Sequence, residues 1–440
     1  MDASDVLRQS LSHWSPNAKY VAAADKNRVL VREPETLKLL QAFICLGKVE
    51  RIEWSPDSQF LLTEIARQGP LQIWSLRDSD WTCRIYEGLP GVTGIARARW
   101  GAASDRVLVV VEFQLYLSIW PLQEGASAMQ IHHPKFASKG CAFSRDGFWL
   151  ALLRRKDCKD RLGIYNSEED FSRLTDVVLS GDAGDVAWAP DDNTLLVWER
   201  PGSTPWCRLF SLAGECLAQV GDGLPRSVAP SPSLQLLAGC GIDGQLQLLS
   251  AVSKNILVNL PHHLADAMLQ CEGDEVFLWE EYVELVDGES VPKRGYTRIE
   301  DPGRFLSERS VPESLDVEGI PKQGITLASW SPDERFLATK HESFHGVVWI
   351  WDLGRLALHS VLRHRAGVVA MSWDPAAKAD RSRLAISTAD AALFLWAPAG
   401  PWAWVSPLPA AKLRWRSDGR SLLLQERDRF CICRLGPAAL

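Results

Sequence analysis

The chain has 440 residues, and its 48 Lys and Arg against 55 Asp and Glu give a formal net charge of −7. This length accommodates one large all-β domain or two to three smaller ones, and 46% hydrophobic residues suffice for a substantial core. Because phosphate backbones attract basic surfaces, the acidic balance argues against nucleic acid as the main partner. The 19 Trp against only 4 Met indicate a periodically placed aromatic residue rather than a plastic helical core.

The N-terminal residues and the cysteines indicate a cytosolic protein. The segment from Met1 to Leu11 has neither a basic region nor an apolar run, so we expect no secretory signal there. No apolar stretch approaches the roughly 18 residues that cross a bilayer, and the densest, Val107 to Val111, has the length of a strand. Ten Cys at irregular spacings are typical of reduced, buried thiols. We therefore predict no membrane insertion.

A turn of the form aromatic-Ser-Pro-Asp or Asn recurs from the N-terminus to the C-terminus. Its clear copies begin at Trp14, Trp54, Trp188 and Trp330, and its weaker copies begin at Trp100, Phe143, Pro230, Trp373 and Trp415. Neighbouring copies lie 40 to 46 residues apart, except for a 100-residue interval between Pro230 and Trp330. A period of about 40–45 residues is that of one four-stranded propeller blade.

Each copy continues in the same way. One apolar run precedes the turn, a second follows it, and a third ends in Trp plus a small or acidic residue, as at Ile73 to Ser75 and Ile350 to Asp352. These runs are short, rich in β-branched and aromatic residues, and bounded by Gly, Pro, Asp and Ser, which indicates strands. The recurrent Pro and the short alternating runs exclude a helical solenoid. We expect the third-strand Trp to pack between neighbouring blades.

These units predict an all-β WD-repeat β-propeller with nine recognisable repeats plus a degenerate one. Residues 1–260 supply blades one to six, residues 261–325 a degenerate blade or hairpin and a long irregular loop, and residues 326–440 the remaining blades. Because propellers typically have four to eight blades, both one oversized ring and two rings fit this number. We favour the single oversized ring.

Two irregularities interrupt the repeat. In the long interval, Val276 to Val283 reads as a degenerate blade or an extra hairpin, and Val286 to Gln323 carries four Pro with few apolar residues. A segment of this kind is an exposed loop, a partner-binding element or a domain boundary. The last unit ends after its third strand, Phe430 to Cys433, so its outer strand is missing. Because propellers commonly close when one terminus completes the blade begun by the other, the residues before Trp14 could supply that strand.

Two motifs resemble catalytic or ligand-binding sequences but have structural interpretations. The Gly spacing from Gly239 to Gly244 matches a dinucleotide fingerprint, yet a strand-like run follows it instead of a helix, so we predict a type I′ hairpin turn at Asp243–Gly244. Cys431 and Cys433 lack the second pair of ligands that a zinc site needs, so we interpret them, together with Cys158, as core cysteines.

The histidine pairs His132–His133 and His262–His263 lie in connections next to Pro, and their adjacent spacing does not place two ligands on one face. We interpret them as loop residues. The sequence contains no P-loop, no nucleophile elbow and no His-Glu-x-x-His motif. We therefore predict a protein that is not an enzyme, with no catalytic residues, no cofactor and no metal site.

Two groups of residues are candidates for partner binding. Arg154, Arg155 and Lys156 belong to a basic run between a second and a third strand, where they either bind phosphate or an acidic partner or form a solvated hairpin tip. Trp402 and Trp404 share one face near an outer strand, and they form either an interaction patch or a contact with the adjacent blade.

The order and detail of the units resemble one group of propellers, the centrosomal and spindle-pole WD-repeat protein eight family, whose vertebrate member is encoded antisense to the p-seventy-three gene. The resemblance covers essentially the whole chain, and its stretches are Ile52 to Leu76, Arg155 to Asp160, Trp188 to Trp198, Trp330 to Asp352 and Trp373 to Gly400. The WD turns are generic, whereas the Asp-Cys-Lys-Asp hairpin from 157 to 160 and the position of the single long interval are much more specific.

The resemblance implies a non-enzymatic adaptor in the cytoplasm and cytoskeleton, at the centrosome or spindle pole. Its implied partner is a coiled-coil anchoring protein of the centriolar-satellite type, with γ-tubulin-containing complexes and a minus-end-directed kinesin as further partners. The implied roles are microtubule minus-end anchoring, mitotic spindle organisation and cilium assembly. The alternative is an oversized propeller in translation or ribosome-associated assembly, which the missing basic stripe and the charge of −7 disfavour.

Overall fold

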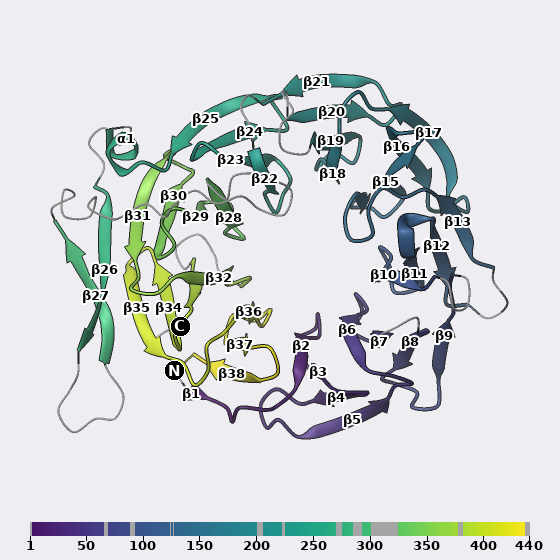
Figure 1. Cartoon of the computed structure of the whole chain (residues 1–440), viewed down its shortest axis with the longest axis horizontal. Helices are drawn as coiled ribbons and strands as arrows, with labels where there is room; N and C mark the ends of the chain where they lie inside the picture. The colour runs from purple at the N-terminus through teal and green to yellow at the C-terminus, as the bar shows by residue number, and fades with distance from the viewer. Residues whose placement is uncertain are drawn as a thin grey trace. The chain divides into compact units, whose positions relative to one another are not determined.

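The computed structural model describes residues 2–65, 69–88, 93–123, 125, 127–199, 206–221, 225–269, 275–284, 293–300, 324–376 and 382–435. These residues form nine sheets, eight of four strands and one of six (Figure 1). The prediction of an all-β β-propeller fold with nine repeats is therefore confirmed. No helix in the described ranges is long and apolar enough to cross a membrane. The blades belong to two compact units, which we describe one at a time.

The first unit comprises Arg8–Ser203 and Cys207–Gln219 and contains blades one to five. In chain order the strands of these blades are β2 (Ser10–Trp14), β3 (Val21–Asp25), β4 (Arg28–Arg32) and β5 (Leu39–Ile44); β6 (Val49–Trp54), β7 (Phe60–Ile65), β8 (Leu71–Ser75) and β9 (Thr82–Ile85); β10 (Ile95–Trp100), β11 (Arg106–Val111), β12 (Tyr116–Pro121) and β13 (Met129–His132); β14 (Cys141–Phe143), β15 (Trp149–Lys156), β16 (Lys159–Asn166) and β17 (Ser172–Val178); and β18 (Ala183–Trp188), β19 (Thr194–Glu199), β20 (Cys207–Ser211) and β21 (Cys216–Val220). A 3-10 turn, η1 (Glu112–Gln114), lies between β11 and β12.

The second unit comprises Met1–Leu7, Thr204–Trp206 and Val220–Leu440 and contains blades six to nine. Its blade strands are β22 (Pro225–Pro230), β23 (Leu236–Gly241), β24 (Gln245–Ser250) and β25 (Asn255–Pro261); β28 (Ile325–Trp330), β29 (Phe336–His341), β30 (Val347–Asp352) and β31 (Ala357–Arg363); β32 (Val368–Trp373), β33 (Leu384–Thr388), β34 (Ala392–Ala397) and β35 (Gly400–Val405); and β36 (Lys412–Trp415), β37 (Ser421–Gln425) and β38 (Phe430–Arg434) with β1 (Asp2–Ala3). One short helix, α1 (Leu264–Leu269), follows the sixth blade.

The serine of the repeated turn explains why the motif requires Ser and then Asp or Asn. In the seventh blade, Ser331 Oγ accepts the N–H of Phe336 at 2.9 Å and donates to Asp333 at 2.5 Å. The turns that begin at Trp14, Trp54 and Phe143 contain the same pair of bonds. The motif therefore satisfies the polar groups of the turn locally before the second strand begins.

The tryptophan that begins the turn joins its blade to the preceding one. Its indole Nε1 donates to the main-chain carbonyl of the residue just before the corresponding turn of the preceding blade. The pairs are Trp54 to His13 at 3.2 Å, Trp100 to Glu53 at 3.4 Å, Trp188 to Ala142 at 3.0 Å, Trp330 to Ala229 at 3.0 Å, Trp373 to Ser329 at 2.8 Å and Trp415 to Ser372 at 2.8 Å. We call this repeated hydrogen bond the indole latch.

The third-strand tryptophans pack between blades, as predicted. In the eighth blade Trp396 is fully buried, and its ring centroid lies 5.2 Å from that of Phe336 in the seventh blade and 5.9 Å from that of Trp373. Trp351 of the seventh blade is also fully buried, in the cluster shared with the sixth blade. These indoles supply the large apolar contacts that pack one sheet against the next.

The N-terminal residues complete the ninth blade. Strand β1 pairs antiparallel with β38, with Asp2 opposite Arg434 and Ala3 opposite Cys433 (Figure 1). The Ser4 N–H donates to the Ile432 carbonyl at 2.8 Å, and Leu7 and Phe430 exchange main-chain bonds of 2.9 and 3.0 Å. The strand that the last repeat lacks therefore comes from the chain start, which leaves β38 paired on both sides.

The predicted tenth, degenerate repeat is an extra hairpin and not a blade. Its strands are β26 (Phe277–Glu284) and β27 (Lys293–Ile299), and β26 pairs in parallel with β31, from Phe277 opposite Ser360 to Glu280 opposite Arg363. Figure 1 shows the hairpin beside β31 and β35. Of the two predicted alternatives, a degenerate blade or an extra hairpin, the structure therefore shows the hairpin. The sequence left both open because an apolar run indicates a strand but not its partner. Most of the proline-rich stretch from Val286 to Gln323 lies outside the described residues.

Removing residues 1–7 should destabilise the second unit. The deletion removes four hydrogen bonds between Ser4 or Leu7 and the last strand, and at about 1 kcal/mol for each bond we expect a loss of about 4 kcal/mol in the free energy of unfolding. Urea unfolding followed by far-UV circular dichroism measures the loss. Asp5→Ala is the control, since no hydrogen bond or ion pair of its side chain is found among the described residues. An unchanged unfolding midpoint in the deletion variant contradicts the conclusion that residues 1–7 complete the ninth blade.

Candidate interaction surfaces

The basic run lies on a tight hairpin of the fourth blade. Strands β15 and β16 pair as far as Lys156 opposite Lys159, so Asp157 and Cys158 form a two-residue turn with φ angles of 53° and 59°. Two successive positive φ angles define a type I′ turn. The Cys158 side chain is exposed at this turn, so its interpretation as a core cysteine was wrong.

The three predicted basic residues have different environments. Arg154 is buried, and it donates to the His132 carbonyl at 3.1 Å and to the Tyr165 hydroxyl at 3.0 Å. Arg155 pairs with Asp160 and Asp182, each at 2.7 Å. Only Lys156 is exposed without a polar partner in the described structure. Two of the three cations are therefore held by the fold.

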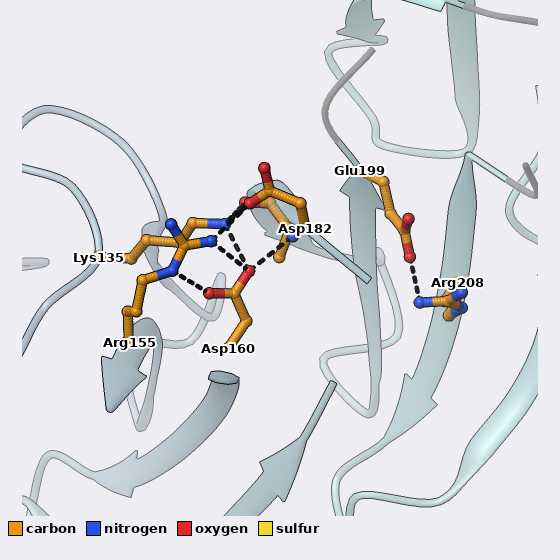
Figure 2. A network of polar contacts seen from close by, with 7 residues as sticks. Lys135, Arg155, Asp160, Asp182, Glu199 and Arg208 are labelled. Carbon is orange, nitrogen blue, oxygen red and sulfur yellow. Dashed lines mark hydrogen bonds and ion pairs between the residues drawn. The ribbon is translucent and has the colours of Figure 1, made fainter. Parts of the chain in front are cut away.

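A lysine that sequence reasoning did not select lies at the centre of this network (Figure 2). The Lys135 ammonium lies 2.5 Å from carboxylate oxygens of both Asp160 and Asp182, and it also donates to the Ala183 carbonyl. The side chains of Lys135 and Asp160 are each 2% exposed. The Ala183 N–H donates to Asp160 at 2.9 Å, so the network joins the fourth blade to the first strand of the fifth. A single Lys without periodicity gives no sequence signal for such a role.

The charges of the network stabilise one another. Burial alone raises the pKa of Asp182, but the hydrogen bond and charge of Lys135, followed by those of Arg155, outweigh it and lower the pKa below its usual value. The hydrogen bond to Asp160 raises the pKa of Arg155. Within the fifth blade, Arg208 pairs with Glu199, whose side chain is 3% exposed (Figure 2). The contacts of Lys135, Asp160 and Asp182 connect the fourth blade to the fifth. The pair of Arg208 and Glu199 lies within the fifth blade.

Lys135→Met should destabilise the first unit strongly, because it leaves the buried Asp160 without its ammonium partner. Breaking a buried pair costs about 3–5 kcal/mol, and we expect the lower end of this range because Arg155 still pairs with Asp160. Chemical denaturation measures the change. Lys156→Met is the matched control, since the Lys156 side chain is exposed and its replacement removes no described contact. This variant should change the stability by no more than about 0.5 kcal/mol. Equal stability of the two variants is incompatible with the network as described.

Trp402 and Trp404 both lie on β35, opposite Leu395 and Leu393 respectively. Both are half-buried and pack against the apolar cluster that the eighth blade shares with the ninth, which includes Leu413. The structure therefore places both indoles at a blade-to-blade contact. They belong to the second unit, whereas Arg154, Arg155 and Lys156 belong to the first.

The extra hairpin is fixed to the blades by buried polar groups that the sequence did not reveal. The Glu281 side chain is 1% exposed and accepts from Arg294 at 2.9 Å and from the Arg365 N–H at 2.8 Å. Arg294 also pairs with Asp390 of the eighth blade. The hairpin is thus connected to both the seventh and the eighth blades.

A second contact holds the same hairpin. The Tyr296 hydroxyl lies 2.7 Å from His364 Nε2, and His364 Nδ1 lies 2.9 Å from the Gly346 carbonyl. Burial lowers the pKa of His364 to about 4. Burial, with a contribution from the Glu281 charge, raises the pKa of Tyr296 well above its usual value. Both groups are therefore neutral near pH 7 and act as hydrogen-bonding supports.

His262 lies in the loop between β25 and α1, as predicted, but its side chain is buried. It is 4% exposed, its Nε2 lies 2.6 Å from Thr339 Oγ1, and its ring packs against Trp349 and Trp351. Burial, with a contribution from His341, lowers its pKa to about 3. The loop position between β25 and α1 is therefore confirmed, but the side chain is buried because this loop packs against the seventh blade. Its neighbour His263 is exposed, as expected.

The other predicted features are structural. Cys431 and Cys433 lie in the core of the ninth blade, and within the described ranges no three His, Cys, Asp or Glu side chains group as a metal site. The Gly239–Gly244 segment joins β23 to β24 in an antiparallel hairpin, so its interpretation as a hairpin turn is confirmed. The expected type I′ geometry was wrong, since Gly244 has a φ of 79° but Asp243 has no positive φ.

The repeated Trp-Ser-Pro-Asp turn, the four-stranded sheets and the inter-blade tryptophans define a WD-repeat β-propeller, a class whose members generally serve as non-enzymatic scaffolds. The chain is 31% identical over 451 residues to WD repeat-containing protein WRAP73 of Mus musculus, covering 96% of this chain and 93% of that protein. It therefore belongs to the WRAP73 family, which confirms the resemblance. An uncharacterized WD repeat-containing protein of Schizosaccharomyces pombe is 22% identical over 384 residues, or 83% of this chain and 74% of that one. No protein-family model matches the sequence.

Solved structures show likeness in fold alone. The C-terminal WD40 domain of Sif2 matches with a TM-score of 0.52 and 14% identity over 99% of this chain and 98% of that chain. A eukaryotic initiation factor matches with a TM-score of 0.58 and 10% identity over 92% and 88%. Dihydro-heme d1 dehydrogenase NirN, in complex with DHE, matches with a TM-score of 0.50 and 12% identity over 81% of this chain and 66% of that chain.

Proposed function

We propose that this WD-repeat scaffold acts at the centrosome or spindle pole. The observation that carries the proposal is the likeness to WRAP73 over nearly the full length of both chains. A match over 96% of this chain extends well beyond the generic WD turns. The specific hairpin from Arg155 to Asp160, on which the family resemblance depends, is held in place by the charge network of the fourth blade.

A scaffold needs surface for partners, and the outermost strands offer it. On β5, the edge strand of the first blade, Leu39, Leu40 and Ile44 are 46%, 46% and 68% exposed. Apolar side chains that gather on an exposed edge are typical of protein contacts. WD-repeat propellers generally act as scaffolds, and the apolar edge of β5 offers this chain a surface for partners. Both points support the proposal that the chain is an adaptor that brings other proteins together.

The proposed partner is a coiled-coil anchoring protein of the centriolar-satellite or spindle-pole type. Through it the scaffold would engage γ-tubulin-containing complexes and a minus-end-directed kinesin. The proposed roles are minus-end anchoring of microtubules, organisation of the mitotic spindle and assembly of cilia. The proposed location is the cytoplasm, at the microtubule-organising centre.

A role in translation receives no comparable support. The likeness to an initiation factor at 10% identity concerns the fold alone, and the net charge of −7 does not favour RNA. The centrosomal role is therefore the proposal that we put to the test.

The fluorescently tagged chain, imaged in dividing cells of its own organism, tests the location. We expect the signal to concentrate at both spindle poles and to overlap γ-tubulin. Affinity purification from the same cells should recover a coiled-coil protein, and the tag expressed alone is the control. Uniform cytosolic signal through mitosis, equal to that of the tag alone, contradicts the proposal.

A further inference from the structure

An apolar groove with an acidic border lies between the second and third blades, within the first unit. It has a volume of about 790 Å³, and its lining includes Phe60, Trp81 and Leu122 on the floor and Asp57, Asp78 and Asp105 at the border. We call it the Trp81 groove. Its size falls within the range of about 300–1,000 Å³ that is typical of ligand-binding clefts.

Four loops at the same end of the two blades form the groove. They are the β6–β7 turn, the β8–β9 connection, the β10–β11 turn and the residues after β12. The Asp57 N–H donates to Ser104 Oγ at 3.1 Å, which ties the first turn to the third. The Trp81 N–H donates to the Asp78 carbonyl at 3.3 Å, which holds the second loop in a compact turn. These two hydrogen bonds therefore help to hold the walls in place.

The floor of the groove is apolar. The rings of Phe60 and Trp81 lie 5.2 Å apart between centroids, at an angle of 56°. Phe60, Trp81 and Leu122 are half-buried and pack against the core cluster shared by these two blades. Each presents part of its side chain to the groove, so an apolar group that enters would meet three rigidly supported neighbours.

The border of the groove is acidic. Asp57, Asp78 and Asp105 are exposed, and no ion pair joins Asp57 or Asp78 to any residue that the structure describes. Asp105 lies 3.5 Å from Arg106, but that guanidinium also donates to the Ser167 carbonyl at 2.7 Å. The groove lining includes no Lys or Arg. All charged residues of the lining are therefore acidic.

We propose that the Trp81 groove binds an amphipathic segment of a partner protein, with an apolar side chain on the floor and flanking Lys or Arg residues opposite Asp78 and Asp105. This inference rests on the proposed scaffold function, for which it names a binding site. Charge complementarity selects the occupant, because an acidic segment or a phosphate would meet like charge at the border. A helix from a basic coiled coil has this pattern, with apolar and basic residues recurring on one face.

The floor provides the kind of contact that dominates protein interfaces. Binding energy concentrates in a few aromatic or aliphatic groups that fill well-packed pockets, while charged residues at the rim select partners and speed association. In the Trp81 groove, Phe60, Trp81 and Leu122 supply the apolar contact. Asp78 and Asp105 supply the charged rim. Binding should therefore require both the apolar and the basic residues of the partner segment.

Three synthetic peptides of equal length test the proposal with the full chain. One repeats Leu and Lys at helical spacing, the second replaces each Lys with Glu, and the third replaces each Leu with Ser. Fluorescence anisotropy measures their affinities. We expect the Leu–Lys peptide to bind at least about tenfold more tightly than either of the others, a difference of about 1.4 kcal/mol. Equal affinity of the Leu–Glu peptide overturns the proposal.

Charge variants locate the binding on the chain. Asp78→Lys combined with Asp105→Lys should weaken the Leu–Lys peptide at least about tenfold. The matched control is Asp25→Lys combined with Glu215→Lys, which changes the net charge equally at two exposed positions away from the groove lining. If the groove variant does not fold, as judged by circular dichroism, Asp78→Asn with Asp105→Asn decides in its place. An equal loss in groove and control variants, or no loss in either, overturns the proposal.

The two proposals fail separately. If the wild-type chain does not reach the spindle poles but the peptide binding depends on Asp78 and Asp105, the cellular role is wrong and the groove stands. If the wild-type chain and the groove variant both reach the poles and bind the Leu–Lys peptide equally, the groove is wrong and the cellular role stands.

Discussion

The indole latch is the interaction on which the arrangement of the blades depends. The strand-to-strand ladders lie inside the blades, so one blade meets the next mainly through side chains and a few main-chain bonds, such as those from Val49 to Lys26 and from Val368 to His345. Apolar contact by itself does not fix a register. The Trp indole combines a large buried surface with a single directed donor. By donating to a carbonyl at the same place in each preceding blade, as Trp373 does to Ser329, it sets the relative position of two sheets at one point.

The latch is missing where the anchor is not Trp, and other contacts take its place. At the fourth blade the anchor is Phe143, which has no donor, and Arg99 of the third blade donates to the Cys141 carbonyl at 2.9 Å instead. The same blade contains Lys135, whose buried ammonium joins it to the fifth. In the sixth blade the anchor is Pro230, and within the second unit the buried indole of Trp206 donates to Gln247 on β24 at 2.8 Å. Directed polar contacts thus recur even where the motif is degenerate.

The sequence was informative where structure depends on local chemistry. The Ser-Pro-Asp turn satisfies its own polar groups, so its period predicted nine blades and the missing last strand. Prediction from the sequence failed where structure depends on partners that lie far away in the chain. The run that became β26 indicated a strand, but nothing in it specified parallel pairing with β31. Lys135 and Glu281 became important only when folding brought opposite charges to them, and no spacing rule anticipates that.

The most direct test of the indole latch as the organising contact is the stability of Trp373→Phe against that of Trp404→Phe, in the same unit. The first variant removes the Nε1 donor to Ser329, while the second removes an indole N–H without a described hydrogen bond. Denaturant unfolding monitored by circular dichroism should show a loss of about 0.5–1.5 kcal/mol for Trp373→Phe, because the half-buried Ser329 carbonyl loses its donor, and a clearly smaller loss for Trp404→Phe. Equal losses, or the larger loss in Trp404→Phe, would contradict the account.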